Sequence, residues 1–344
     1  MKDIFNDIVQ WEEEGKDFAL ARVVNTWRSA PRQVGAGMAI SEEGNMIGSV
    51  SGGCVEKSVV KKALALLQSN SEELLSYGVG NEDAWEVGLS CGGKIEVFVQ
   101  RFPGSIKDTE SNRSIWKGLK EAIQDNRGAV YVSGITGSGQ SFLCGEDGSV
   151  IGDYKEDLKA KAVEALQKRQ SEIIEYEGEK YFLHVFTRKD RLLLVGSAHI
   201  TSELIALATF YDFETIVIDP RDTFARQTNY SVKPGSLFVE WPQEVMNDLV
   251  LDEYTYAVNL SHDPKIDDES LAILLRKPVA YIGALGSKKT HEKRLERLMN
   301  RGFSEDELKR IHAPVGLGIN AQLPGEIALS IMAEIIKVKN TPGD

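Results

Sequence analysis

Residues 191–199 read Arg-Leu-Leu-Leu-Val-Gly-Ser-Ala-His, and this stretch decides the fold of the C-terminal part of the chain. The continuous apolar run over 192–195 is typical of a strand that is buried in a parallel sheet. Gly196 predicts a tight turn into a helix over 200–210. A second apolar strand follows over 215–219 and ends in an aspartate. This order and spacing indicate the first strand–helix–strand unit of a Rossmann-like domain.

The phosphate-binding fingerprint of this unit is incomplete. A full fingerprint has three glycines, which serve the turn, the close approach of a pyrophosphate and the packing of the helix. Here only Gly196 is present, and Ala198 and Thr201 stand at the other two positions. The pattern leaves two interpretations open: a domain that binds a nicotinamide dinucleotide, and a Rossmann scaffold that does not.

Two further segments fall at the predicted carboxyl ends of strands, where ligands bind in open parallel sheets. The first, 259–263, carries His262 next to an aspartate, and this pair is either an acid–base pair or a turn that caps the strand. The second, 282–289, has Gly286 and Ser287 at a helix start and two lysines after them. A phosphate site and a solvated basic helix face both fit this second pattern.

The N-terminal part carries two glycine–cysteine clusters, 48–56 (Gly-Ser-Val-Ser-Gly-Gly-Cys-Val-Glu) and 89–94 (Leu-Ser-Cys-Gly-Gly-Lys). The first lies between a short strand and a helix predicted over 57–68, so backbone N–H groups and the helix dipole favour an anion there. Cys54, close to the helix start, is a candidate nucleophile or soft metal ligand, and Cys91 meets that condition less clearly. The alternative is that both cysteines are small buried residues under glycine turns.

The whole pattern predicts an α/β protein, with an N-terminal mixed α+β domain followed by a Rossmann-like parallel sheet with helices on both faces. We expect an N-terminal domain over 1–103, a connecting α/β segment over 104–190 and the Rossmann-like domain over 191–338, with a linker over 103–114. No internal repeat is visible in the sequence. Hydrophobic periodicity predicts further helices over 2–14, 114–125, 157–169, 305–311 (with Ser304 and Glu307 as a capping box) and from 324 on. It predicts further strands over 18–27, 38–40, 46–48, 94–99, 129–134 and 140–145, two within 172–186, and others near 236–240, 255–260 and 279–283.

Composition bounds the class of protein. The chain has 344 residues, enough for two domains with cores of their own. Its formal net charge of −12 argues against general binding to nucleic acid or to anionic membranes. No apolar run reaches the length of a membrane span, and residues 1–16 lack the pattern of a signal peptide. Three cysteines fit a reducing compartment, so we expect a cytoplasmic protein.

Taken together, these motifs resemble those of the xanthine dehydrogenase accessory factors, also described as carbon monoxide dehydrogenase accessory proteins. The segments that carry the resemblance are spread over nearly the whole chain: 48–56, 90–93, 218–221, 281–287, 312–317 and 324–331. The resemblance implies a maturation factor, a chaperone rather than a turnover enzyme, that binds the molybdenum cofactor and protects it. It also implies help with sulfuration by a cysteine desulfurase, and delivery to a xanthine dehydrogenase-type molybdenum hydroxylase. The chain has too few cysteines for two four-cysteine iron–sulfur clusters, so it is not the dehydrogenase itself.

The molybdenum cofactor is a pterin dithiolene with a phosphate, which some forms extend to a dinucleotide. We expect Cys54 to act on the molybdenum–sulfur centre, as catalytic group and metal ligand. The residues expected to bind the rest of the cofactor are Ser51, Gly52, Gly53, Cys91, Gly196, Ala198, His199, Asp219, Arg221, His262, Gly286 and Ser287. We expect both ends in one cleft, within one subunit or across a homodimer. The alternative is an NAD(P)-dependent oxidoreductase in which Asp219 binds the ribose and His262 is acid or base; a scaffold that retains no ligand is third.

Overall fold

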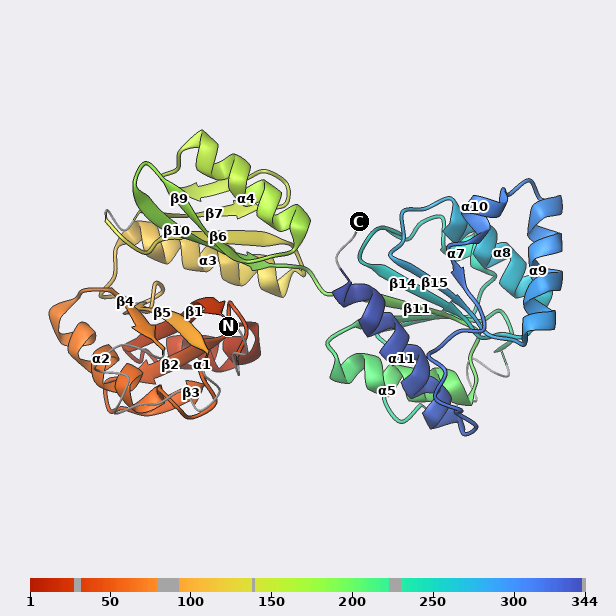
Figure 1. Cartoon of the computed structure of the whole chain (residues 1–344), viewed down its shortest axis with the longest axis horizontal. Helices are drawn as coiled ribbons and strands as arrows, with labels where there is room; N and C mark the ends of the chain where they lie inside the picture. Colours follow the sequence, from red (N-terminus) through yellow and green to blue (C-terminus); the bar gives the residue numbers. More distant parts are fainter. Residues whose placement is uncertain (28–31, 79–92, 138–139, 223–229, 342–344) are drawn as a thin grey trace. The chain divides into compact units, whose positions relative to one another are not determined.

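The computed structural model describes residues 1–27, 32–78, 93–137, 140–222 and 230–341. The chain divides into two compact units, Met1–Arg188 and Lys189–Asp344, and each is described by itself (Figure 1). The first unit contains both the expected N-terminal domain and the expected connecting segment. Within the described residues, no helix is both long and apolar enough to span a bilayer.

The first unit contains two five-stranded sheets of the same topology. Their strand orders are β3-β2-β1-β5-β4 and β8-β7-β6-β10-β9, and every neighbouring pair is antiparallel. The first half comprises a short 3-10 helix (Lys2–Ile4), α1 (Phe5–Glu13), β1 (Phe18–Trp27), β2 (Gly37–Ser41), β3 (Met46–Gly48), α2 (Glu56–Ser69), β4 (Glu73–Tyr77) and β5 (Lys94–Arg101). The second half comprises α3 (Glu110–Gln124), β6 (Ala129–Gly134), β7 (Ser141–Gly145), β8 (Val150–Gly152), α4 (Glu156–Lys168), β9 (Glu172–Tyr176) and β10 (Glu179–Phe186).

Element order and strand pairing are therefore duplicated, and the expectation of no internal repeat is wrong at the level of the fold. The strand registers make Arg22 in the first half equivalent to Ser133 in the second, and Gln100 equivalent to His184. These two pairs share a place in the sheet but not a residue type, whereas Phe98 and Phe182 are equivalent and identical. Single matches such as this one do not form a repeat motif that can be recognised in the sequence.

The two sheets share a buried polar contact at Arg22. This side chain is fully buried, and its Nη2 donates to Oε1 of Gln100 and to Oγ of Ser133, each at 3.0 Å. Three aromatic rings surround its guanidinium, those of Phe98, Tyr131 and Phe182. Helices α2 and α4 pack on the outer faces of the two sheets, while α1 and α3 join the core between them (Figure 1).

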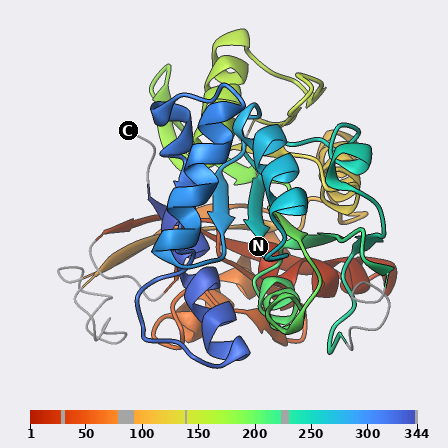
Figure 2. The same ribbon diagram turned by 90° about the vertical axis from the view of Figure 1, so that its right-hand side faces the viewer.

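The second unit is a six-stranded parallel sheet of order β13-β12-β11-β14-β15-β16. Its strands are β11 (Arg191–Val195), β12 (Glu214–Ile218), β13 (Ser236–Phe238), β14 (Thr255–Asn259), β15 (Tyr281–Ala284) and β16 (Ile311–His312). Its helices are α5 (His199–Phe210), α7 (Pro242–Val245), α8 (Pro264–Leu275), α9 (Lys288–Asn300), α10 (Glu305–Leu308) and α11 (Pro324–Asn340). Helices α5 and α11 cover one face of the sheet and α7, α8 and α9 the other (Figure 1); Figure 2 shows this unit from another side. The predicted fold class is confirmed.

The polar stretch expected as a linker over 103–114 is partly helical. Helix α3 begins at Glu110 rather than at 114, because the Thr109 hydroxyl caps it by accepting a hydrogen bond from the N–H of Asn112 at 3.1 Å. Threonine at this position satisfies a backbone donor that the first helical turn leaves unpaired. The first turn of α3 is polar, so hydrophobic periodicity does not indicate where the helix begins.

The helix expected over 305–311 is shorter than predicted. Its capping box is confirmed, since Ser304 and Glu307 exchange hydrogen bonds through backbone and side chain. The helix ends at Leu308, and the chain then pairs with β15 as the short edge strand β16. Pairing with the sheet outcompetes continuation of the helix.

Candidate functional site

The glycine–cysteine loop between β3 and α2 is built around the carboxylate of Glu56, the first residue of α2. This carboxylate accepts hydrogen bonds from the N–H groups of Val50, Ser51 and Gly53 at 3.2, 2.8 and 2.8 Å. It also accepts from the hydroxyls of Ser49 at 2.7 Å and Ser51 at 2.5 Å. Because five donors of one loop converge on one carboxylate, Glu56 sets the shape of the loop.

The hydrogen bonds of the loop stabilise the ionised form of Glu56. Burial by itself raises the pKa of this carboxyl, but the hydrogen bonds from Ser51, Ser49 and the loop backbone outweigh burial and lower the pKa to about 2. The carboxylate is therefore ionised at neutral pH. It lies in the first turn of α2, where the helix dipole also favours negative charge.

This network limits what the loop can bind through its backbone. The sequence predicts that the backbone N–H groups of this loop face an anionic ligand. Instead, the carboxylate of Glu56 accepts the hydrogen bonds of three of these N–H groups. The N–H of Gly52 donates to the hydroxyl of Ser49 at 2.8 Å. Gly52 and Gly53 are exposed, with φ of +77° and +122°. A Cβ at Gly53 would meet no described atom within 4 Å. Among the residues that the structure describes, the space over Gly53 is therefore open.

Cys54 is half-buried, precedes α2 by two residues and is a free thiol that packs against the core of the first sheet. Cys91 lies outside the described residues. Cys144, on β7, is fully buried, and burial raises the pKa of its thiol, as suits a structural residue. Among the described residues, no group of three or more His, Cys, Asp or Glu side chains is placed to hold a metal ion.

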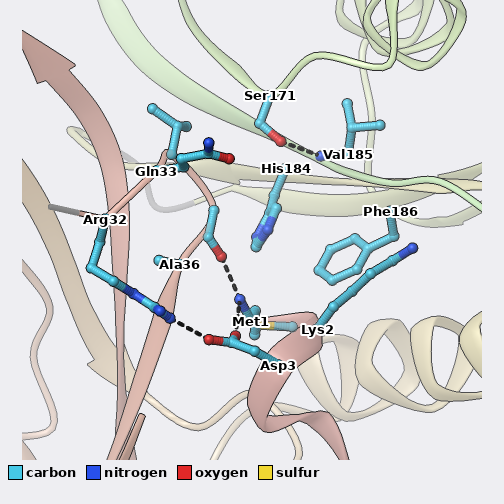
Figure 3. Close-up of a pocket in the computed structure, with 12 residues that line it drawn as sticks. Met1, Lys2, Asp3, Arg32, Gln33, Ala36, Ser171, His184, Val185 and Phe186 are labelled. Carbon is cyan, nitrogen blue, oxygen red and sulfur yellow. Dashed lines mark hydrogen bonds and ion pairs between the residues drawn. The ribbon is translucent and has the colours of Figure 1, made fainter. Parts of the chain in front are cut away.

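A cavity of about 470 Å³ lies between the two halves of the first unit (Figure 3). It is lined by Met1, Lys2, Asp3 and residues 32–36 of the first half, and by Ser171 and residues 184–186 of the second. Arg32 connects this cavity to the glycine–cysteine loop. Its Nε donates to the carbonyl oxygen of Ser49 at 3.1 Å, and its Nη2 pairs with the carboxylate of Asp3.

In the second unit, Gly196 makes the turn from β11 to α5 with a φ of +107°. A Cβ at this position would lie 2.5 Å from the nitrogen of Ser261, so two loops at the carboxyl edge of the sheet touch here. Thr201, which replaces a fingerprint glycine, is buried in α5, and its hydroxyl donates to the carbonyl oxygen of Gly196 at 2.7 Å. This hydrogen bond from the first turn of α5 therefore stabilises the turn at Gly196.

Asp219, directly after β12, is fully buried and its carboxylate is saturated by protein donors. The N–H of Ser197 donates to Oδ2 at 2.6 Å. Arg221 donates to Oδ1 through its backbone N–H and Nε, both at 2.9 Å, and to Oδ2 through Nη2 at 2.8 Å. A dinucleotide ribose needs this acid free to accept its hydroxyl groups. Here Arg221 occupies the carboxylate.

The other expected ligand residues of the second unit lie in the loops after β11, β14 and β15, at the same edge of the sheet. His199 is the exposed first residue of α5, directly after Ala198. His262 is exposed, with a φ of +61°. Ser287 caps α9 by accepting a hydrogen bond from a backbone N–H of the first turn at 3.2 Å, and Gly286 before it has a φ of +134°. The topology thus gathers at one edge residues that are distant in sequence.

Three residues of these sites were not among those expected: Glu56, Arg32 and His184. Glu56 had only a weak local signal, an acid at the start of a predicted helix, where the helix dipole favours negative charge. Arg32 and His184 had none. Their contacts join segments far apart in the chain, which no short motif records.

Comparison with known proteins now gives the family context. Residues 192–335 match the family described as the XdhC Rossmann domain, and residues 11–78 match the one described as the XdhC and CoxI family. The chain is 28% identical over 331 residues to a Bacillus subtilis protein named as a probable xanthine dehydrogenase subunit, covering 95% of this chain and 94% of that protein. It is 26% identical over 329 residues to the molybdenum cofactor insertion chaperone PaoD of Escherichia coli, covering 94% of this chain and 84% of PaoD.

A solved structure described as a xanthine dehydrogenase from Bacillus halodurans has the same fold, with a TM-score of 0.75 at 23% sequence identity. The likeness covers 97% of this chain and 95% of that one. The two family matches together span more than half of the sequence and reach both units. The chain carries XdhC family domains in both of its units.

Proposed function

We propose that this chain is a maturation factor that binds the molybdenum cofactor, protects it and delivers it to a xanthine dehydrogenase-type molybdenum hydroxylase. The observation that carries this proposal is the similarity over 94% of the chain to a protein named as a molybdenum cofactor insertion chaperone. The relative named as a probable xanthine dehydrogenase subunit supports the class of client.

The site geometry supports binding of the metal–sulfur end of the cofactor by the first unit and of its phosphate end by the second. The loop of Ser51, Gly52, Gly53 and Cys54 offers a free thiol and, among the described residues, open space over Gly53. This suits a soft molybdenum–sulfur centre that brings its own dithiolene ligands. Cys91, expected at the same end, stays a proposal. In the second unit, the carboxyl edge of the parallel sheet suits the phosphate or nucleotide end of the cofactor. The residues proposed there are Gly196, Ala198, His199, Asp219, Arg221, His262, Gly286 and Ser287, with Asp219 acting by holding Arg221 rather than by contacting the ligand.

The proposal includes two partners and one assembly. A cysteine desulfurase would be the sulfur donor for the cofactor, and Cys54 would be the group of this chain that contributes to the transfer. The client receives the sulfurated cofactor. We further propose a cytoplasmic homodimer, and one cleft that holds both ends of a single extended ligand, within one protomer or across the dimer.

An NAD(P)-dependent oxidoreductase is the second candidate function. The parallel sheet and the spacing from Gly196 to Asp219 favour it. The bonds from Arg221 to Asp219 count against it, because the acid that would bind the ribose is already occupied. Titration with NADH should leave nicotinamide fluorescence unchanged. Saturable binding, with substrate-dependent absorbance change, would favour this candidate instead.

The test of the proposed function is to identify what the protein retains. The chain is produced in a host that makes the molybdenum cofactor, and molybdenum and pterin are measured in the purified protein. We expect the two in equal amounts, with a nucleotide if the dinucleotide form is bound. A Cys144→Ser variant, altered only in the core of β7, is the matched control and should retain the same amounts. Purified folded protein without pterin or molybdenum would contradict the proposal.

A further inference from the structure

Arg294, on α9, forms a buried ion pair in the second unit. The residue is 2% exposed, and its Nη2 lies 3.6 Å from Oδ2 of Asp267, which is buried in the first turn of α8. Among the described residues, Nε and Nη1 of Arg294 are shielded from solvent and have no hydrogen-bond partner. The pair therefore keeps two charges out of water through one long contact.

Such a pair is a weak source of stability. Buried ion pairs can often be replaced by apolar residues without loss of stability, because removing two charges from water is costly. Burial lowers the pKa of Arg294 and raises the pKa of Asp267, as expected when charged groups lose their hydration. By contrast, Arg297 on the same helix donates through Nε and Nη2 to both oxygens of Asp268, at 2.5 and 2.9 Å. Stability therefore does not account for the pair of Arg294 and Asp267.

Arg294 and Asp267 hold two loops at the carboxyl edge of the parallel sheet. Nη2 of Arg294 donates to the carbonyl oxygen of Leu285 at 2.8 Å, and Leu285 lies in the turn that leads from β15 into α9. Oδ1 of Asp267 accepts a hydrogen bond from the hydroxyl of Ser261, after β14, at 2.7 Å. One buried guanidinium thus joins the loop after β15 to the loop after β14.

Ser261 in turn contacts two further loops of this edge. Its carbonyl oxygen accepts a hydrogen bond at 3.2 Å from Nη1 of Arg221, which follows β12. Its nitrogen lies 2.5 Å from the position that a Cβ at Gly196, after β11, would take. The four loops that carry the residues proposed for the phosphate end are therefore connected through Ser261 and Leu285 to Arg294.

We propose that Arg294 is a positioning residue of the second unit, which fixes the loops after β14 and β15 in the arrangement that binds the phosphate end of the cofactor. The inference rests on the proposed function, which assigns the ligand of this edge. Arg294 is buried and acts through Leu285, and through Asp267 on Ser261, rather than by touching the ligand. Loops that are held in the bound arrangement beforehand bind a ligand more tightly. This role accounts for a buried pair that is a weak source of stability.

The test replaces the ion pair by apolar residues in the full chain. Arg294→Met combined with Asp267→Leu removes both charges together, so no charge stays buried without its partner. The probe is molybdenum cofactor released from a donor molybdoenzyme. Its dissociation constant is measured by ultrafiltration with molybdenum analysis, and thermal unfolding is recorded in parallel. We expect the dissociation constant to rise about tenfold while the melting temperature is unchanged or higher.

The neighbouring pair on the same two helices is the matched control. Arg297 and Asp268 bond to each other and join α9 to α8, which lie on the same face of the sheet (Figure 1). Arg297→Met combined with Asp268→Leu should lower the melting temperature, because a well-formed pair is lost, and should leave the dissociation constant unchanged. The opposite pattern in the two double variants separates positioning of the loops from packing of the helices.

A second variant keeps the test decisive if the first does not fold. Arg294→Met combined with Asp267→Asn keeps an oxygen that accepts from Ser261, so it should bind the cofactor more tightly than the combination with Asp267→Leu. A dissociation constant within about twofold of the parent in the folded apolar variant overturns the inference, as does an equal loss of affinity in the control. If neither Arg294 variant folds, the pair stabilises the unit and the inference is wrong. If the parent retains neither pterin nor molybdenum, the proposed function fails and this inference with it.

Discussion

At the scale of single residues, Glu56 decides how the glycine–cysteine loop is used. Glycine-rich loops before helices commonly turn their N–H groups toward an anion. In this chain a carboxylate from the following helix occupies that position and receives three loop N–H groups. The loop is therefore preformed without ligand. We infer that Glu56 is a positioning residue, which holds Cys54 at a fixed place on the surface of the loop.

Replacing Glu56 by glutamine should disturb both the loop and the cofactor. The amide keeps the size of the side chain but turns an NH₂ group toward donors that need an acceptor. We expect a loss of about 1–3 kcal/mol in the free energy of unfolding, measured with urea. We also expect reduced molybdenum retention, which Glu56→Asp should partly restore. Glu43→Gln is the control, since Glu43 is exposed and the change should stay within about 0.5 kcal/mol. Equal stability of the two variants would refute the role of Glu56.

The pKa of Glu56 gives a pH dependence with a definite sign. The folded state lowers this pKa from 4.5 to about 2. The carboxylate therefore stabilises the folded state fully above about pH 4.5–5, and this contribution is lost as the pH falls toward 2. The difference in unfolding free energy between the parent and Glu56→Gln should be constant from pH 7 to about 5 and should shrink below that. A difference that stays constant down to pH 3 would mean that the charge of Glu56 is not what holds the loop.

At the scale of elements, the two halves of the first unit differ in their connections. The first half joins its elements through residues 28–36, 49–55 and 78–93, where the second half uses the shorter segments 135–140, 153–155 and 177–178. The strand registers bring the ends of all three longer connections to one edge of the first sheet. The first half therefore carries the candidate site, and the second half supplies the far wall of the cavity beside it.

In the turn after β11, the close contact with Ser261 requires glycine at position 196. Gly196→Ala places a Cβ 2.5 Å from the nitrogen of Ser261 and keeps a left-handed φ, so it should destabilise the second unit by clearly more than the backbone cost of about 1–2 kcal/mol. Gly302→Ala is the matched control, because Gly302 has a φ of +91° but no described atom within 4 Å of a Cβ. Thermal unfolding should rank Gly196→Ala well below Gly302→Ala. Equal losses would show that the contact with Ser261 is not what requires glycine.

At the scale of the whole molecule, one extended ligand should protect both units. We expect hydrogen exchange to slow on cofactor binding in two places, the loop of residues 49–56 and the carboxyl-edge turn of residues 196–199. The reason is that a single ligand with a metal–sulfur end and a phosphate end contacts both. The measurement compares protein with and without retained cofactor. Protection of one segment alone would mean that the two sites act on different molecules.

The second unit was the more predictable from sequence. Its strands are continuous apolar runs and its turns follow local rules, so the parallel sheet and the place of Asp219 followed from spacing. The spacing of motifs does not predict which side chains pair, even when they are close in sequence. Arg221 lies two residues from Asp219, and its guanidinium donates to both oxygens of that carboxylate.

The first unit was less predictable because its defining contacts join distant segments. Arg22 bonds to Ser133 across the two sheets, and Gly35 lies against His184. Neither contact can be predicted from a short segment of sequence, because its two residues are far apart in the chain. The duplication of the fold was hidden because single matching residues do not form a repeat motif. Cys54 was placed correctly beside the start of α2, yet the carboxylate two residues later, rather than the backbone, determines what its loop offers.

The central claim is most directly tested by reconstitution of a client. An apo xanthine dehydrogenase-type hydroxylase is mixed with this protein, molybdenum cofactor and a cysteine desulfurase, and xanthine oxidation is measured. We predict activation that depends on the chain, is lost with folded Cys54→Ser and is kept with Cys144→Ser. Activation that is the same without the chain, or the same with Cys54→Ser, would contradict the account.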